Sequence, residues 1–110
     1  MDHKQRDHKK RDYKELASRI GFDEDDFHEL VELFVTTSLS DIDKIKKAVL
    51  QNNCKETAAA SHSVKGASGN LGFDDIFALA SDMEMQAKND NLEDFDSYIN
   101  QLENSVNALK

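Results

Sequence analysis

The sequence predicts an all-α protein, an antiparallel up-down-up-down four-helix bundle with a short additional helix at its N-terminal end. Two observations support this fold class. The 110 residues contain no proline and only four glycines, which is too little turn punctuation for a strand-rich domain. Apolar residues recur at helical spacing in four long segments, and residues that favour turns or helix caps separate these segments. A chain of this length is expected to form one domain.

The first two helices are predicted from their capping residues. Asp12 and Glu15 have the spacing of a capping box, and Gly21 suits the end of this short helix. Its few apolar residues cannot build a core, so it is expected to lie across a larger element. Asp23 can cap the next helix, which we expect to run from about residue 24 to 51, with its apolar stripe interrupted at residues 38–40.

Three further helices are predicted from the turns between them. Asn53 caps the third, which carries a thin stripe of small residues and ends at Gly72. The fourth begins near Phe73 and ends at residues 89–90, and the fifth opens at Asp90 or Asn91. The inward stripe expected for the fourth helix contains Phe73, Ile76, Phe77, Ala80, Met83 and Ala87.

Charge divides the chain into a basic start and an acidic body. Residues 1–11 carry five Lys or Arg against two Asp, so the remainder has 9 basic and 20 acidic residues, a net charge of −11 within a total of −8. We therefore expect a basic and flexible N-terminal tail over residues 1–11 and the bundle domain over residues 12–110. An acidic body disfavours nucleic acids and anionic membranes as partners.

Several functional classes are excluded by what the sequence lacks. Cys54 is the only cysteine, so neither an intrachain disulfide nor a cysteine-rich zinc site is possible. No apolar run approaches the ~20 residues of a membrane span, and the N-terminus has no signal-peptide core. We expect a cytoplasmic protein. No P-loop or kinase-type glycine-rich loop is present, so we expect no ATP-dependent kinase activity.

The third predicted helix holds the candidate chemistry. His62 lies at the edge of its apolar stripe, Lys65 follows one turn later on the same face, and Gly66 removes side-chain bulk there. A neutral imidazole is a competent nucleophile near neutral pH, and an ammonium beside it can pair with a phosphoryl anion. Gly66 and Gly69 each lower helix propensity by roughly 1 kcal/mol, so close packing or the close approach of a partner must compensate.

Residues 62–72, His-Ser-Val-Lys-Gly-Ala-Ser-Gly-Asn-Leu-Gly, resemble the motif of histidine-containing phosphotransfer (HPt) domains of two-component phosphorelays. That motif is approximately H-x-[LIV]-K-G-x-[SA]-x-x-[LIVM]-G, and each of its fixed positions is matched. Phe34 in the long helix and Met83-Glu84 in the fourth helix also match common features of the family, so the resemblance covers roughly residues 16–110.

The resemblance implies a role for each matching residue. His62 would accept a phosphoryl group on Nε2, Lys65 would pair with that group, and Glu84 would hydrogen-bond the imidazole. Lys88 would add positive potential, or it is a solvated surface lysine. A receiver domain would dock on the face around His62, where the expected contacts are Ala58, Ala59, Gly66, Gly69 and Lys88.

The resemblance also implies the partners. We expect response-regulator receiver domains, a hybrid sensor histidine kinase, or both, with a monomeric HPt protein. No cofactor or metal is expected on this chain, and the Mg²⁺ ion would be held by the receiver. The alternative from another class is a helical interaction module that does no phosphotransfer, for which His62 would be dispensable. A metal-binding bundle is disfavoured because Glu24 and His28 form the only Asp/Glu-x-x-x-His pair of the sequence, with no second such pair to face it.

Overall fold

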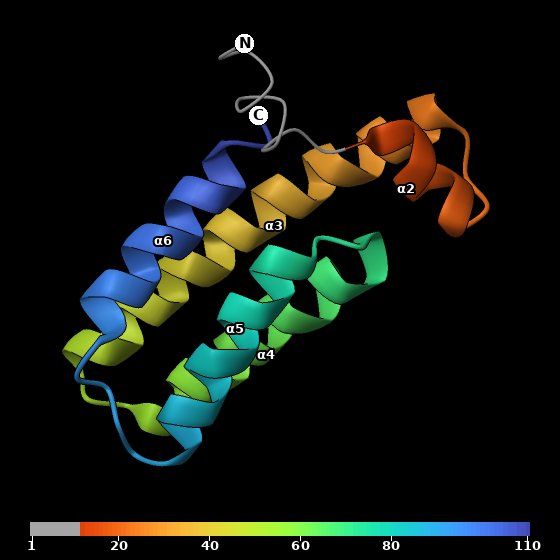
Figure 1. Cartoon of the computed structure of the whole chain (residues 1–110). Helices are drawn as coiled ribbons and strands as arrows, with labels where there is room; N and C mark the ends of the chain where they lie inside the picture. Colours follow the sequence, from red (N-terminus) through yellow and green to blue (C-terminus); the bar gives the residue numbers. More distant parts are fainter. Residues whose placement is uncertain (1–11) are drawn as a thin grey trace, which may run out of the picture.

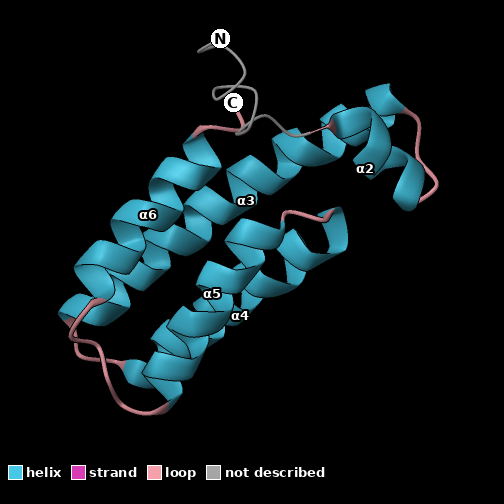
Figure 2. Ribbon diagram, in the orientation of Figure 1, coloured by secondary structure: helices cyan, strands magenta, loops and turns pink. Residues whose placement is uncertain are grey.

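The computed structural model describes residues 12–110, so the predicted tail over residues 1–11 lies outside the described part. Within residues 12–110 all regular structure is helical, which confirms the all-α fold class (Figure 2). The described helices are α2 (Tyr13–Arg19), α3 (Glu24–Leu50), α4 (Cys54–Leu71), α5 (Asp74–Lys88) and α6 (Phe95–Asn107).

The four long helices pack side by side around one core. α4 contacts α3 and α5, and α6 contacts α3 and α5, so the four helices form a closed ring. α4 runs opposite to α3, α5 opposite to α4 and α6 opposite to α5, and α2 lies beside the N-terminal end of α3 (Figure 1). The most extensive of these contacts is between α4 and α5, the two helices that carry the residues of the candidate site. No helix in residues 12–110 has both the length and the apolarity needed to cross a bilayer.

Three of the predicted helix starts are confirmed by their capping hydrogen bonds. The side chain of Asp12 accepts from the backbone N–H of Glu15, and Asp23 accepts from Asp26. Asn53 caps α4 in the same way, because its side-chain oxygen accepts from the N–H of Glu56 at 3.0 Å. Such a bond satisfies an N–H group that has no partner within the helix.

Aromatic side chains pack α2 against α3 and the α4–α5 connection. The Tyr13 ring lies edge-on to Phe27 of α3, with 5.5 Å between their centroids, and Phe27 in turn contacts Phe73 in the α4–α5 connection. Leu16 of α2 packs on Gly72, where an added Cβ would lie 2.9 Å from Leu16 Cδ2. Gly72 has a φ of +82°, which ends α4 in the left-handed conformation that glycine tolerates best.

Most of the predicted inward stripes form the core, but Phe77 was placed there wrongly. Its side chain is 39% exposed and lies against α4 at Gly69, where the absence of a side chain leaves room for the ring. The inward positions beside it are filled by Ile76 and Ala80. The largest fully buried apolar side chains are Phe27, Phe73, Phe95, Ile42, Ile45, Ile76, Met83, Leu102, Val64 and Val106.

The start of the last helix was also predicted too early. α6 begins at Phe95, not at Asp90 or Asn91. Asp90 has a φ of +60°, which is incompatible with a right-handed helix. The Asn91 side chain accepts from the N–H of Glu93 and donates to Gln86, so it holds a loop between α5 and α6.

Candidate functional site

His62 is an exposed residue on a helix whose other face is in the core. Its side chain is 67% exposed, whereas the neighbouring Ser61 and Val64 are fully buried. The Ser61 hydroxyl donates to the carbonyl of Thr57 on the same helix and therefore faces inward. The imidazole stands at the margin of the buried stripe, as the apolar pattern predicted.

Glu84 of α5 meets the imidazole from the buried side. Glu84 Oε2 lies 2.9 Å from Nδ1 of His62, and the Glu84 side chain is only 7% exposed. A carboxylate can only accept hydrogen bonds, so the proton between the two atoms belongs to Nδ1. In the neutral imidazole, the second ring nitrogen, Nε2, therefore carries the free lone pair.

The charge state of Glu84 follows from its surroundings. Burial raises the pKa of the Glu84 carboxyl, but hydrogen bonds from Lys88 and His62 and the charges on these residues outweigh burial. The net result is a pKa below the ordinary value. Glu84 is therefore an ionised carboxylate at neutral pH, and its partners compensate its desolvation.

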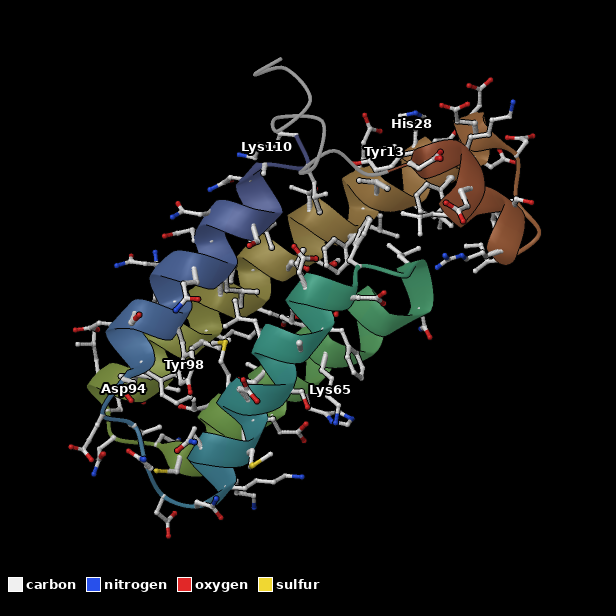
Figure 3. The ribbon with its side chains drawn as sticks, viewed as in Figure 1. Tyr13, His28, Lys65, Asp94, Tyr98 and Lys110 are labelled. Carbon is white, nitrogen blue, oxygen red and sulfur yellow. The ribbon has the colours of Figure 1, made fainter. Side chains whose placement is uncertain are left out.

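Two lysines complete the cluster. Lys65 of α4 donates from Nζ to Glu84 Oε1 at 3.4 Å, and Lys88 pairs with Glu84 Oε2 at 3.0 Å from one turn further along α5. The Lys65 side chain is 32% exposed and that of Lys88 is 66% exposed. Lys65 lies on the side of the α4–α5 pair that faces away from α6 (Figure 3). One carboxylate and two ammonium groups leave a net positive charge beside His62 in an acidic protein.

The two glycines that follow His62 have different surroundings. A Cβ added to Gly66 would meet nothing within 4 Å, so no packing contact of the described residues explains this glycine. A Cβ added to Gly69 would lie 3.0 Å from Cδ1 of Phe77, which is tighter than an ordinary contact. Close packing therefore explains Gly69, whereas Gly66 leaves an open surface one turn from His62.

A depression of about 600 Å³ runs along α4 and α5 on one side of the imidazole. It brings together several of the predicted residues. Ala59 is exposed, but Ala58 is only 7% exposed and belongs largely to the core. Cys54 is half-buried at the same depression. The residues that line it are Cys54, Lys55, Ala58, Ala59, His62, Glu84, Ala87, Lys88 and Asp90.

Two contacts near the site were missed from the sequence. The Ser63 hydroxyl donates to Asp41 Oδ2 of α3 at 2.8 Å, which ties α4 to α3 next to His62. The Lys65 ammonium lies 5.9 Å from the centroid of the Phe77 ring. Nothing in the spacing of Ser63 and Asp41 predicts their contact. The aromatic contact was missed because Phe77 was expected in the core.

The other described histidine has a different environment. His28 lies near the start of α3 beside Tyr13, with 4.9 Å between the ring centroids, and away from Lys65 (Figure 3). It is exposed and pairs with Glu24 at 3.7 Å, as expected for a surface residue. Within residues 12–110 there is no group of three or more His, Cys, Asp or Glu side chains that could hold a metal ion.

Comparisons with known proteins agree with this geometry. A family model described as "Hpt domain" matches residues 29–110. The crystal structure of histidine-containing phosphotransfer protein B (HptB) from Pseudomonas aeruginosa PAO1 is similar, with a TM-score of 0.72 and 26% sequence identity. This similarity covers 86% of the present chain and 82% of HptB. A comparison with curated proteins found no match. Because the family model spans 82 of the 110 residues and a member of similar fold has been solved, the chain belongs to the Hpt domain family, the histidine phosphotransfer domains of two-component signalling.

Proposed function

We propose that His62 carries the phosphoryl group. It would take this group from the aspartyl phosphate of a receiver domain, free or within a hybrid histidine kinase, and pass it to the aspartate of a response regulator. The observation that supports this role best is the pairing of His62 Nδ1 with the buried carboxylate of Glu84. This contact orients an exposed imidazole and directs the reactive Nε2 toward solvent, where a partner can reach it.

The transfer step balances with the groups at the site. The Nε2 lone pair of His62 attacks phosphorus, the P–O bond of the acyl phosphate breaks, and the aspartate carboxylate of the receiver leaves. The proton on Nδ1 stays in place, so the imidazole ring gains positive charge as the N–P bond forms. The Glu84 carboxylate at 2.9 Å stabilises that charge, and the reverse step restores the neutral ring.

The two lysines would act on the phosphoryl group itself. Phosphoryl transfer depends on in-line positioning and on neutralising the charge of the equatorial oxygens. Lys65 and Lys88 both reach Glu84, so their ammonium groups lie close to the imidazole before any phosphoryl group arrives. The Mg²⁺ ion of the reaction would be held by the receiver, where it would neutralise phosphoryl charge.

The docking face would be the exposed side of α4 around His62. Ala59 and Gly66 give this face little side-chain bulk, and the open space at Gly66 lets the backbone of a partner approach closely. At Gly69 a partner would meet the Phe77 ring that packs there. Ala58 would contribute little because it is 7% exposed. Some transient signalling encounters bury less than about 1,200 Å². A monomer that exchanges partners fits such a contact.

We assign the fold as an antiparallel up-down-up-down bundle with α2 across one end, which presents α4 and α5 together on one face. The protein would act in the cytoplasm as a phosphoryl carrier and would depend on another protein for phosphate from ATP. Its acidic body fits protein partners rather than nucleic acids or anionic membranes.

One experiment separates this function from that of a helical interaction module. A receiver domain is charged with acetyl phosphate, freed of the small molecule and mixed with the protein. When the acetyl phosphate carries an isotopic label in its phosphoryl group, acid-labile and alkali-stable label is expected on the wild-type protein and absent from His62→Gln. His28→Gln is the matched control, because His28 is also an exposed helical histidine with a carboxylate partner. Equal label on His62→Gln and the wild type would refute the proposal.

A further inference from the structure

Phe77 occupies a position that core packing does not explain. Its ring is 39% exposed and rests on the α4 backbone at Gly69, where an added Cβ would approach the Cδ1 and Cε1 atoms to 3.0 and 3.2 Å. The same ring also contacts the candidate site, because the Lys65 ammonium lies 5.9 Å from the centroid of the Phe77 ring. This distance is within the range of a cation–π interaction.

Lys65 is held between two groups of α5. Because α4 and α5 are antiparallel neighbours, Glu84 stands level with His62 and Phe77 stands level with Gly69. Lys65 lies between these two levels, and a helical side chain leans toward the N-terminus of its helix, which here is the direction of His62. The Glu84 carboxylate holds the ammonium on that side at 3.4 Å, and the Phe77 ring stands behind it.

Exposure supports this confinement. The Lys65 side chain is 32% exposed, about half the 66% of Lys88, although both lysines pair with the same carboxylate. Lys88 is bound by Glu84 of its own helix one turn away. Lys65 has both the carboxylate and an aromatic ring of the facing helix beside it, and it is the more confined of the two cations.

We propose that Phe77 is a positioning residue for Lys65. The ring closes the space into which the lysine would otherwise swing, and its face attracts the ammonium, so the cation stays beside the imidazole where the phosphoryl oxygens would arrive. This inference rests on the proposed function of His62 and Lys65. Gly69 belongs to the same arrangement, since a side chain at that position would push the ring away from α4.

The size of the effect follows from the strength of such a contact. An exposed cation–π interaction translates into about a two- to five-fold change in a rate constant. Phe77→Leu keeps an apolar side chain of similar size but removes the aromatic face. It should slow single-turnover transfer by about this factor at saturating receiver. Phe77→Tyr keeps the face and should transfer at the wild-type rate.

A double-mutant cycle with Lys65→Met distinguishes positioning from other roles. If Phe77 acts through Lys65, Phe77→Leu slows transfer in the wild-type background and has no further effect beside Lys65→Met. Equal slowing in both backgrounds, or a raised half-saturating receiver concentration with an unchanged rate constant, would mean a docking role and would overturn the inference. Urea unfolding of each variant shows whether the fold is intact.

A second variant tests the ring position without removing the ring. Gly69→Ala should displace the ring and slow transfer, and this slowing should also disappear beside Lys65→Met. If the slowing persists in that background, the proposed role of Gly69 in placing Phe77 is wrong. A wild type that takes no label would overturn the proposed function together with this inference. If the wild type takes label but the effects of Phe77→Leu and Lys65→Met on the transfer rate are additive, the inference alone would be overturned.

Discussion

Glu84 Oε2 of α5 lies 2.9 Å from Nδ1 of His62 on α4, and the carboxylate is 7% exposed while the imidazole is 67% exposed. The contact joins a buried charge to an exposed nucleophile across the most extensive helix interface of the bundle. It fixes which ring nitrogen carries the proton. It also explains how a carboxylate is tolerated in an inward position, because three donors from His62, Lys65 and Lys88 surround it.

Removing the charge of Glu84 should slow transfer. Glu84→Gln keeps a hydrogen-bond acceptor for Nδ1 but loses the negative charge that stabilises the ring during attack. The difference between a charged and a neutral hydrogen bond predicts a decrease on the order of 5-fold in single-turnover transfer at saturating receiver. Glu84→Leu, which also loses the acceptor, should transfer more slowly than Glu84→Gln. Two variants as fast as the wild type would contradict the role of this contact.

Acid should weaken the fold through the same carboxylate. The pKa of Glu84 is lower in the folded protein than its ordinary value of 4.5, so the folded state binds this proton less readily than the unfolded state. The stability that Glu84 contributes is complete above pH 4.5 and is lost as the pH falls from 4.5 through the folded-state pKa. Urea unfolding over this range should show a steeper loss for the wild type than for Glu84→Gln.

The control for the acid experiment is Glu29→Gln, a substitution of an exposed carboxylate on α3. It should follow the acid dependence of the wild type, because it leaves the cluster around Glu84 intact. Parallel curves for the wild type and Glu84→Gln would show that the partners of Glu84 do not favour its ionised form in the folded state.

Gly66 and Gly69 provide a matched pair for stability. Alanine at an exposed helix position gains up to about 1 kcal/mol over glycine. Gly66→Ala should give this gain in urea unfolding, because its Cβ would meet nothing within 4 Å. Gly69→Ala should gain less or lose stability, because its Cβ would lie 3.0 Å from the Phe77 ring. Equal gains from the two variants would show that the ring moves away without loss.

The sequence predicted the helices well where a local signal marks their ends. Side chains of Asp12, Asp23 and Asn53 cap the helices that they were expected to start. The prediction of the start of α6 failed because Asp and Asn are also the residue types that cap helices. In the structure Asp90 takes a positive φ and the Asn91 side chain donates to Gln86, so both belong to a loop. A cap and a loop of this kind differ in backbone conformation and not in residue type.

The site was predicted in part for a related reason. Helical spacing predicted correctly that His62 and Lys65 share one face, because residues three apart are neighbours on the surface of any α-helix. The partnership with Glu84 depends on the register between α4 and α5, and only the family resemblance pointed to it. The prediction for Phe77 failed because Ile76 and Phe77 both suit the apolar stripe, whereas in the structure Ile76 is buried and Phe77 lies against Gly69 of α4. A one-helix pattern contains no information about the facing helix.

Gly72 should be the glycine least tolerant of alanine. Its φ of +82° disfavours any L side chain by roughly 1–2 kcal/mol, and an added Cβ would also lie 2.9 Å from Leu16. Gly21 is the control for backbone strain alone, because its φ is +78° and its Cβ would meet nothing within 4 Å. Urea unfolding should therefore rank Gly72→Ala below Gly21→Ala. The opposite order would mean that the contact between α2 and the end of α4 contributes nothing.

The two lysines should differ in their effect on phosphotransfer. Lys65 is the more confined cation and faces its partner across the helix interface, so Lys65→Ala should slow single-turnover transfer by about 10-fold. Lys88 is 66% exposed and its pair is screened by solvent, so Lys88→Ala should slow transfer by only about 2-fold. Lys14→Ala on α2 is the control and should transfer at the wild-type rate, since it lies outside the cluster. A larger effect from Lys88→Ala than from Lys65→Ala would mean that the exposed lysine is the one that meets the phosphoryl group.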